Sequence, residues 1–185
     1  RGAAKVARFA KLEETVLGGK AEVIVEHFRR HVLPELGGTA KAMVVTSSRE
    51  HAIRMHQAIR KYIEEKAYAD TKALVAFSDK ITVDGQEFTE ASINGFPESE
   101  LPRRFDREDW YVLVVAEKYQ TGFDQPKLVA MYVDKKLSGL QAVQTLSRLN
   151  RTHTGKERTF VLDFQNTTDE IKEAFKPYYE VSAIE

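Results

Sequence analysis

Short apolar runs alternate with longer amphipathic segments along most of the chain. The runs are six or seven residues long and rich in β-branched side chains, which is typical of buried strands. Strands that alternate with helices usually pair in parallel and carry helices on both faces of the sheet. The pattern therefore predicts an α/β fold with a mainly parallel sheet, whose strands we expect at 41–47, 72–78, 111–116, 128–133 and 159–164.

Two helices are predicted ahead of the first strand. Helical periodicity over 4–17 meets Gly18-Gly19, and we interpret this glycine pair as a stop signal. A second helix is expected over 20–33, because Pro34 follows it and cannot continue a helix.

The same periodicity predicts the later helices. One covers 49–66, and Ser47 with Glu50 three residues later matches a capping box at its start. Segment 79–97 carries turn signals without a long period, which favours an insertion or loop with a short hairpin. The remaining helices are expected over 98–105, 139–151 and 169–179.

The helix expected over 139–151 has two contrasting faces. At 100° per residue, Gln144, Arg148 and Arg151 share one narrow face. Two guanidinium groups on one face suit a polyphosphate, because their planar forks match phosphate oxygens. A solvated helix face is the alternative interpretation. The opposite face is apolar and would dock on the sheet through Ala142, Val143, Leu146 and Leu149.

A second polar group follows the strand expected at 111–116. The Thr-Gly turn at Gly122 and the nearby Asp124 would lie at the carboxyl edge of the sheet, where open α/β folds bind ligands. Gly122 would let the backbone approach a ligand, and Asp124 would accept hydrogen bonds from a ribose. An ordinary turn glycine and a turn cap explain the same two residues.

Composition sets bounds without indicating a function. Lys and Arg together number 28, as do Asp and Glu, so the zero net charge argues neither for nor against a nucleic-acid partner. The absence of cysteine is compatible with a reducing cytoplasm, where we expect the protein. We expect no metal site, because His51 and His56 miss the spacing for a shared ion, and no membrane span, because the apolar runs are short.

In combination, the motifs resemble a known family. "VVTSSR", "TGFD" and "QTLSRLNR", in this order, are similar to motifs IV, V and VI of superfamily 2 helicases, which lie in the second of that family's two RecA-like motor domains. The sequence of residues 119–164 resembles the restriction (R) subunit of type I restriction-modification enzymes more closely still. The resemblance spans about residues 21–166. It implies a RecA-like fold and ATP-dependent translocation along double-stranded DNA.

The resemblance implies nucleotide contacts for motifs V and VI. In the family, motif VI arginines reach the ATP phosphates across the cleft between two motor domains. By position, Arg151 matches an arginine finger, Arg148 a second phosphate contact and Gln144 a supporting hydrogen-bonding group. Asp124 matches the motif V residue associated with the ribose and with coupling between the domains, and Gly122 is a backbone-contact candidate beside it.

The resemblance also implies DNA contacts. Ser47, Ser48 and Arg49 match motif IV and stand at a helix start, where a DNA phosphate can bind, and Thr121 is a further candidate. The chain departs from the family at Ala116-Glu117, where many members carry Thr-Asp. The strand-contact role of motif V is therefore less well supported than the arginine roles.

The half of a helicase motor that holds ATP and magnesium is not recognisable in this sequence. Neither Gly19-Lys20 nor Gly155-Lys156 belongs to a phosphate loop, and Asp169-Glu170 opens a helix instead of ending a buried strand. No nuclease site is recognisable either. ATP with magnesium would thus bind mainly to a first motor domain that lies outside this chain.

We expect the chain to be a piece of a longer protein, because it begins with Arg1 and lacks the first motor half. Residues 1–20 would form a lead-in helix from a preceding domain, and residues 21–185 the second motor domain. The expected partners are double-stranded DNA, the first motor and nuclease domains of the parent chain, and methyltransferase and specificity subunits.

Two alternatives remain open. Another superfamily 2 motor, such as a type III restriction or remodelling enzyme, would carry the same motifs, and a nuclease domain upstream of the first motor domain would favour the type I interpretation. A stand-alone α/β binding module is the second alternative. It would show by itself a nucleotide affinity comparable with that of intact motors.

The purified chain should not hydrolyse ATP. It would supply arginines for the transition state but neither a phosphate cradle nor a magnesium ligand. Phosphate release from ATP with and without DNA measures this. Turnover that is abolished by a substitution within the chain would contradict the expectation.

Overall fold

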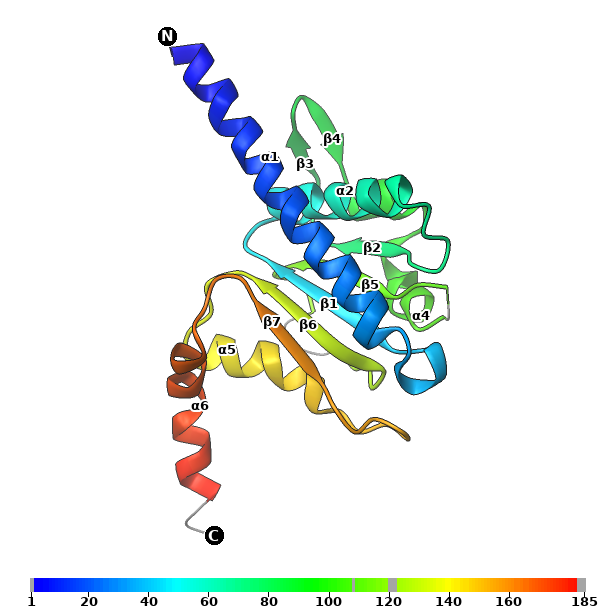
Figure 1. Cartoon of the computed structure of the whole chain (residues 1–185), viewed down its shortest axis with the longest axis vertical. Coiled ribbons are helices and arrows are strands. Elements are labelled where there is room, and N and C mark those ends of the chain that lie inside the picture. The colour runs from blue at the N-terminus through cyan, green and yellow to red at the C-terminus, as the bar shows by residue number, and fades with distance from the viewer. Residues whose placement is uncertain (1, 108, 120–122, 183–185) are drawn as a thin grey trace.

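The computed structural model describes residues 2–107, 109–119 and 123–182, which are built around one five-stranded sheet (Figure 1). The sheet order is β2-β5-β1-β6-β7, and each neighbouring pair is parallel. Every strand lies within two residues of its predicted bounds, so the predicted strands are confirmed. They are β1 (Lys41–Thr46), β2 (Ala73–Ala76), β5 (Val112–Ala116), β6 (Leu128–Asp134) and β7 (Phe160–Asp163).

Helices cover both faces of the sheet, which confirms the predicted α/β, RecA-like architecture (Figure 1). Successive side chains of a strand point to opposite faces, so Val44 joins one core while Met43 and Val45 join the other. The first core contains residues of α1 (Gly2–His27) and α2 (Arg49–Glu65). The second contains residues of α4 (Leu101–Phe105), α5 (Gly139–Leu146) and α6 (Thr168–Ser182).

Helix α1 passes through Gly18 and Gly19 and continues into a π-helical turn over Phe28–Val32, so the predicted stop is wrong. A glycine inside a helix costs only about 1 kcal/mol relative to alanine. Ile24 and Val25 are fully buried shortly afterwards, and burial of each such side chain contributes about 1.5–3 kcal/mol. Packing on the sheet therefore outweighs the glycine pair. The division into a lead-in helix and a main domain stays a prediction.

The segment between β2 and β5 contains the predicted hairpin and a short helix. The hairpin projects beside α2 in Figure 1. A 3-10 turn leads into α4, which confirms the short helix predicted over 98–105. The elements of this insertion are β3 (Ile81–Val83), β4 (Gln86–Phe88), α3 (Glu90–Asn94) and the 3-10 helix Glu98–Glu100. A further 3-10 helix, Glu35–Gly38, precedes β1.

Side chains of the neighbouring helices cover the backbone of β2, the edge strand. Asn94 accepts from the Val75 N–H at 3.0 Å and donates to the Val75 carbonyl at 2.7 Å. The Phe77 N–H donates to Glu90 Oε1 at 3.2 Å, and His56 Nε2 donates to the Ala73 carbonyl at 3.1 Å. Helices α2 and α3 thus satisfy the outer groups of this edge.

Acid should destabilise the fold partly through His56. Burial lowers the pKa of His56 to about 4, whereas an exposed histidine titrates near about 6.5. Between these two values the unfolded chain binds more protons, so the free energy of unfolding falls by about 3 kcal/mol as the pH drops from about 7.5 to about 4. Urea unfolding across this range measures the loss.

The matched variant is His56→Gln, which keeps a donor for the Ala73 carbonyl but does not titrate. It should flatten the pH profile between about pH 7 and about pH 4. The carboxylate of Asp134, whose pKa is lowered, does not interfere, because its contribution is lost only below about pH 4. Equal slopes for wild type and His56→Gln would contradict the assignment.

Candidate functional site

The motif IV residues lie where β1 turns into α2. Ser48 is the N-cap, and its Oγ accepts a hydrogen bond from the His51 N–H at 3.0 Å. The predicted capping box of Ser47 and Glu50 is therefore wrong by one residue, because the backbone becomes helical only after Ser48. The Ser47 hydroxyl instead lies 2.8 Å from His51 Nδ1. Both serines are exposed at the helix start, as a phosphate contact requires.

Arg49 holds the start of α2 against the insertion. Its Nη1 donates to the carbonyl oxygens of Ser78 at 3.3 Å and Lys80 at 3.1 Å. This guanidinium is thus partly engaged within the domain, which sequence reasoning did not anticipate. A DNA contact by Arg49 would use its remaining N–H groups.

A buried carboxylate stands behind this helix start. Asp134 ends β6, and its side chain is 1% exposed. It accepts from Lys20 and Gln165 at 2.8 Å each and from His51 Nε2 at 2.9 Å. Burial alone would raise the pKa of Asp134, but the hydrogen bonds from His51, Gln165 and Lys20 outweigh burial and hold this pKa well below the usual range. Asp134 therefore stays ionised and joins α1, α2, β6 and the segment after β7.

The motif VI segment is only partly α-helical. Helix α5 ends at Leu146, a 3-10 turn covers Ser147–Asn150, and Arg151 has extended backbone angles. The prediction of one helix through residue 151 is wrong at its end. Because a 3-10 turn advances about 120° per residue, the expected common face of the three polar residues is lost. Gln144 and Arg151 are exposed, whereas Arg148 is half-buried. The apolar docking face is confirmed at Ala142, Leu146 and Leu149.

The guanidinium of Arg148 points inward. Its two terminal nitrogens, Nη1 and Nη2, are buried and have no hydrogen-bond partner in the described part of the chain. Burial lowers the pKa of Arg148 to about 10, so the group is still charged at neutral pH. A buried cation without a partner is costly, so Arg148 is a candidate for a functional role.

Arg151 and Asp124 are brought together by the fold. Arg151 Nε lies 3.4 Å from Asp124 Oδ1, and the two side chains are 64% and 67% exposed. Lys156 fixes the backbone on both sides of this pair, because its Nζ donates to the Arg151 carbonyl at 2.7 Å and the Pro126 carbonyl at 3.1 Å. Motifs V and VI therefore meet near the amino ends of β6 and β7. The prediction that Asp124 lies at the carboxyl edge of the sheet is wrong, because the chain has returned to the amino end of β6 when it reaches this residue. Thr121 and Gly122 lie outside the described residues.

The turn after β5 is anchored by an ion pair that the sequence did not reveal. Glu117 and Tyr119 both have positive φ, at 56° and 61°, and such values are uncommon for residues other than glycine. Between them, Lys118 Nζ contacts the buried Glu90 at 2.8 Å and Glu98 at 3.1 Å. The insertion thus holds the backbone that leads into motif V.

Four residues of this region were missed by sequence reasoning: His51, Lys118, Asp134 and Glu90. Asp134 carried a usable signal, since it ends an apolar strand at the edge where α/β folds bind ligands. The others carried none, because their contacts join segments far apart in the sequence. No group of three or more His, Asp or Glu side chains in the described chain is suited to a metal ion. None of the described helices is long and apolar enough to cross a membrane.

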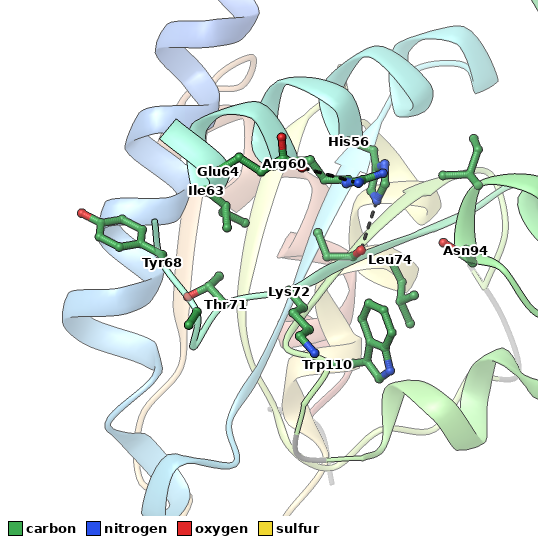
Figure 2. A pocket seen from close by; sticks show the side chains of 13 residues that line it. His56, Arg60, Ile63, Glu64, Tyr68, Thr71, Lys72, Leu74, Asn94 and Trp110 are labelled. Atoms are coloured by element: carbon green, nitrogen blue, oxygen red, sulfur yellow. Dashed lines mark hydrogen bonds and ion pairs between the residues drawn. The ribbon is translucent and has the colours of Figure 1, made fainter. Parts of the chain in front are cut away.

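One cavity of the domain is not part of this site. It measures about 440 Å³ and lies between α2, α3 and the amino end of β2 (Figure 2). His56, Lys72, Asn94 and Trp110 are among its lining residues. Lys72 and Trp110 precede β2 and β5, so the cavity opens near the amino ends of these two strands, away from the motif IV residues at the carboxyl end of β1.

The chain is similar in sequence to subunits of type I restriction enzymes. A family described as "Type I restriction enzyme subunit R domain 3" matches residues 76–166. A putative type I restriction enzyme MjaIXP endonuclease subunit of Methanocaldococcus jannaschii is 29% identical over 177 residues, or 92% of this chain and 16% of the relative. The type I restriction enzyme HindI endonuclease subunit of Haemophilus influenzae is 26% identical over 183 residues, or 91% and 17%.

Solved structures show the same fold. Domain 2 of the DEAD-box helicase Mss116p, bound to an RNA duplex, superposes with a TM-score of 0.57 and 19% identity, covering 88% of this chain and 56% of that one. The ATP-dependent type ISP restriction-modification enzyme LlaBIII, bound to DNA, gives a TM-score of 0.53 and 18% identity, covering 83% and 10%. At these identities the likeness concerns the fold alone.

The fold is therefore that of a helicase-type RecA-like domain. The matched family and the curated relatives support a RecA-like domain of a type I restriction enzyme R subunit, related to helicase motor domains, and this confirms the resemblance inferred from the motifs. The chain spans about a sixth of the length of the curated relatives that it matches.

Replacing Arg148 should stabilise the isolated chain. Arg148→Met keeps an unbranched, flexible side chain and removes a half-buried charge whose terminal nitrogens lack partners in the described chain, so the free energy of unfolding should rise by about 1 kcal/mol. Urea unfolding with an unchanged m-value measures this. The control Leu149→Ala, at a buried neighbour, should instead lower stability by about 2–5 kcal/mol. Marked destabilisation by Arg148→Met would show that the guanidinium is satisfied in the chain.

Proposed function

We propose that this chain is the second motor domain of a type I restriction R subunit and acts on ATP together with a first motor domain during translocation on double-stranded DNA. The buried, unpartnered guanidinium of Arg148 carries this proposal. A folded domain that keeps such a cation at its motif VI is suited to meet an anion supplied from outside.

The nucleotide side of the proposal rests on motifs V and VI. Arg151 is exposed and its Nε lies 3.4 Å from Asp124, so its guanidinium can exchange this contact for a phosphate. Its charge and planar fork would stabilise negative charge that develops on the phosphoryl group. Arg148 would hold a second phosphate oxygen, while Gln144 would supply a neutral hydrogen bond.

Asp124 is proposed to sense whether the nucleotide is present. Once Arg151 turns to phosphate, Asp124 is released to accept hydrogen bonds from a ribose, with Gly122 beside it as a backbone contact. Lys156 keeps both segments in register through its two carbonyl contacts. The phosphoryl group itself comes from ATP with magnesium, which would be held mainly by the first motor domain.

The DNA side of the proposal rests on the start of α2. Ser47 and Ser48 are exposed beside the helix N-terminus, where backbone N–H groups and the helix dipole favour a phosphate. Arg49 and Thr121 would add contacts. Contacts of this kind position the DNA backbone without reading its sequence, and they weaken as salt rises.

The activity of the whole enzyme is likewise a proposal. The relatives are endonuclease subunits six times longer than this chain. We propose that first motor and nuclease domains belong to the same parent chain, and that methyltransferase and specificity subunits bind it. Target recognition would then lie outside this domain, which would contribute motion instead of sequence selection.

Substitution of Arg151 in the intact parent subunit tests the nucleotide role. Arg151→Ala should lower DNA-stimulated ATP turnover by about a hundredfold or more, because a transition-state contact is lost. Arg151→Lys should restore little, since an ammonium lacks the planar fork. DNA binding without nucleotide should change little. A phosphate-release assay with parallel DNA-binding measurements provides both readouts.

Arg158→Ala is the matched control. Arg158 is another exposed arginine of the same region, 3.3 Å from Glu35, and it has no proposed phosphate contact. This variant should keep wild-type turnover. If Arg151→Ala also keeps near-normal turnover, the motif VI face is a solvated surface and the nucleotide role is wrong.

A further inference from the structure

A chain of hydrogen bonds links the exposed Ser47 hydroxyl to the buried Asp134 carboxylate. Ser47 Oγ lies 2.8 Å from His51 Nδ1, and the Ser47 backbone N–H donates to the same nitrogen at 3.1 Å. On the other side of the ring, His51 Nε2 lies 2.9 Å from Asp134 Oδ2. His51 thus stands between the candidate DNA contact and a buried anion.

The backbone amide of Ser47 defines the protonation state of His51 in this arrangement. An amide N–H can only donate, so His51 Nδ1 is an unprotonated acceptor, and Nε2 carries the ring hydrogen and donates to Asp134. In the contact between Ser47 Oγ and Nδ1, the hydroxyl must then be the donor. Both donors of Ser47 are therefore turned toward the ring, which leaves only oxygen lone pairs for an incoming phosphate.

The arrangement of Ser47, His51 and Asp134 does not activate the serine as a nucleophile. A general base needs an available lone pair, and the one on Nδ1 is shared between the hydroxyl and the amide of the same serine. The negative charge of Asp134 is also shared with Lys20 and Gln165. The three residues are better suited to control the orientation of the hydroxyl.

We propose that a DNA phosphate binds at Ser47 together with one proton, which His51 takes up from solvent. The proposal rests on the DNA contact proposed above. A protonated Nδ1 donates to Ser47 Oγ and no longer accepts, so the hydroxyl hydrogen and the backbone N–H of Ser47 both become available to the phosphate. The proton stays on the imidazole while the phosphate is bound. Asp134 is a positioning residue that acts through His51.

The charges around His51 set the direction of each substitution. Asp134, from β6, favours the imidazolium, and Lys20, from α1, opposes it from 2.8 Å beyond that carboxylate. Gln165, after β7, is neutral. On α2 itself, Glu50 is paired with Arg54 at 2.8 Å, and Arg54 also contacts Asp84 of the hairpin at 3.1 Å, so this cluster keeps one negative charge that favours the imidazolium. Histidine side chains change charge between about pH 5 and about pH 8, which makes the coupling measurable.

The test is binding of a short fluorescein-labelled DNA duplex to this chain, followed by fluorescence anisotropy between about pH 6 and about pH 8 at low, constant salt. If one proton is taken up on binding, the affinity for DNA falls by up to about tenfold for each unit by which the pH rises. Calorimetry in two buffers with different heats of ionisation should show uptake approaching about one proton per bound protein toward the upper end of this range.

Four variants locate the proton. His51→Gln should bind with little dependence on pH. Asp134→Asn should move the gain in affinity to lower pH, whereas Lys20→Met should move it to higher pH, because each removes a charge of opposite sign near the ring. His153→Gln, at an exposed histidine in the loop after motif VI, should keep the wild-type profile. If Asp134→Asn does not fold, the shift caused by Lys20→Met still decides the matter.

Ser47→Ala separates this proposal from the DNA contact on which it rests. If Ser47→Ala weakens binding while wild-type affinity is independent of pH, the DNA contact stands and the proton coupling is wrong. A His51→Gln variant with the wild-type pH profile has the same meaning. If Ser47→Ala changes neither affinity nor profile, or if wild type does not bind at about pH 6, the contact at Ser47 is wrong and both proposals fall.

Discussion

Burial of the sheet on both faces excludes polar side chains from most of its length. The polar residues that do lie within its strands stand at strand ends, and each has partners. Lys41, at the start of β1, donates to the carbonyl oxygens of Arg107 and Trp110, while Thr46, at its end, donates to the Val115 carbonyl at 2.8 Å. Asp134 occupies the same position at the end of β6. The chemistry of the domain is thereby confined to the ends of its strands.

This confinement explains why the fold could be predicted from the sequence. Strands buried on both faces are near-continuous apolar runs, and these are visible without knowledge of their neighbours. The errors occurred where local rules compete with packing. Gly18-Gly19 is a stop by local rules, but the burial of Ile24 and neighbouring residues keeps the helix intact. Arg151 left the helix because the last turn tightened, which a uniform 100° step does not foresee.

The candidate site was only partly predictable for a related reason. The resemblance to helicase motifs assigned Arg151 and Asp124 to one nucleotide site, and the structure brings the two side chains within 3.4 Å of each other. The contact between His51 and Asp134 spans 83 residues and depends on the register of β1 against β6, where Thr46 stands opposite Asp134. No periodicity within one segment contains this information. The inward turn of Arg148 is equally a property of the assembled domain, and it leaves the terminal nitrogens of this side chain buried without a hydrogen-bond partner in the described residues.

The covered edge of β2 has a consequence for the domain in a crowded solution. An uncovered edge strand is a template on which a strand of another molecule can add, and this is a route to aggregation. Here Asn94 occupies both backbone groups of Val75, and Glu90 occupies the Phe77 N–H. An intruding strand would have to displace these three hydrogen bonds, and the one from His56 to the Ala73 carbonyl, before forming its own. The insertion that carries these two side chains thus protects the molecule against intermolecular sheet growth at this edge.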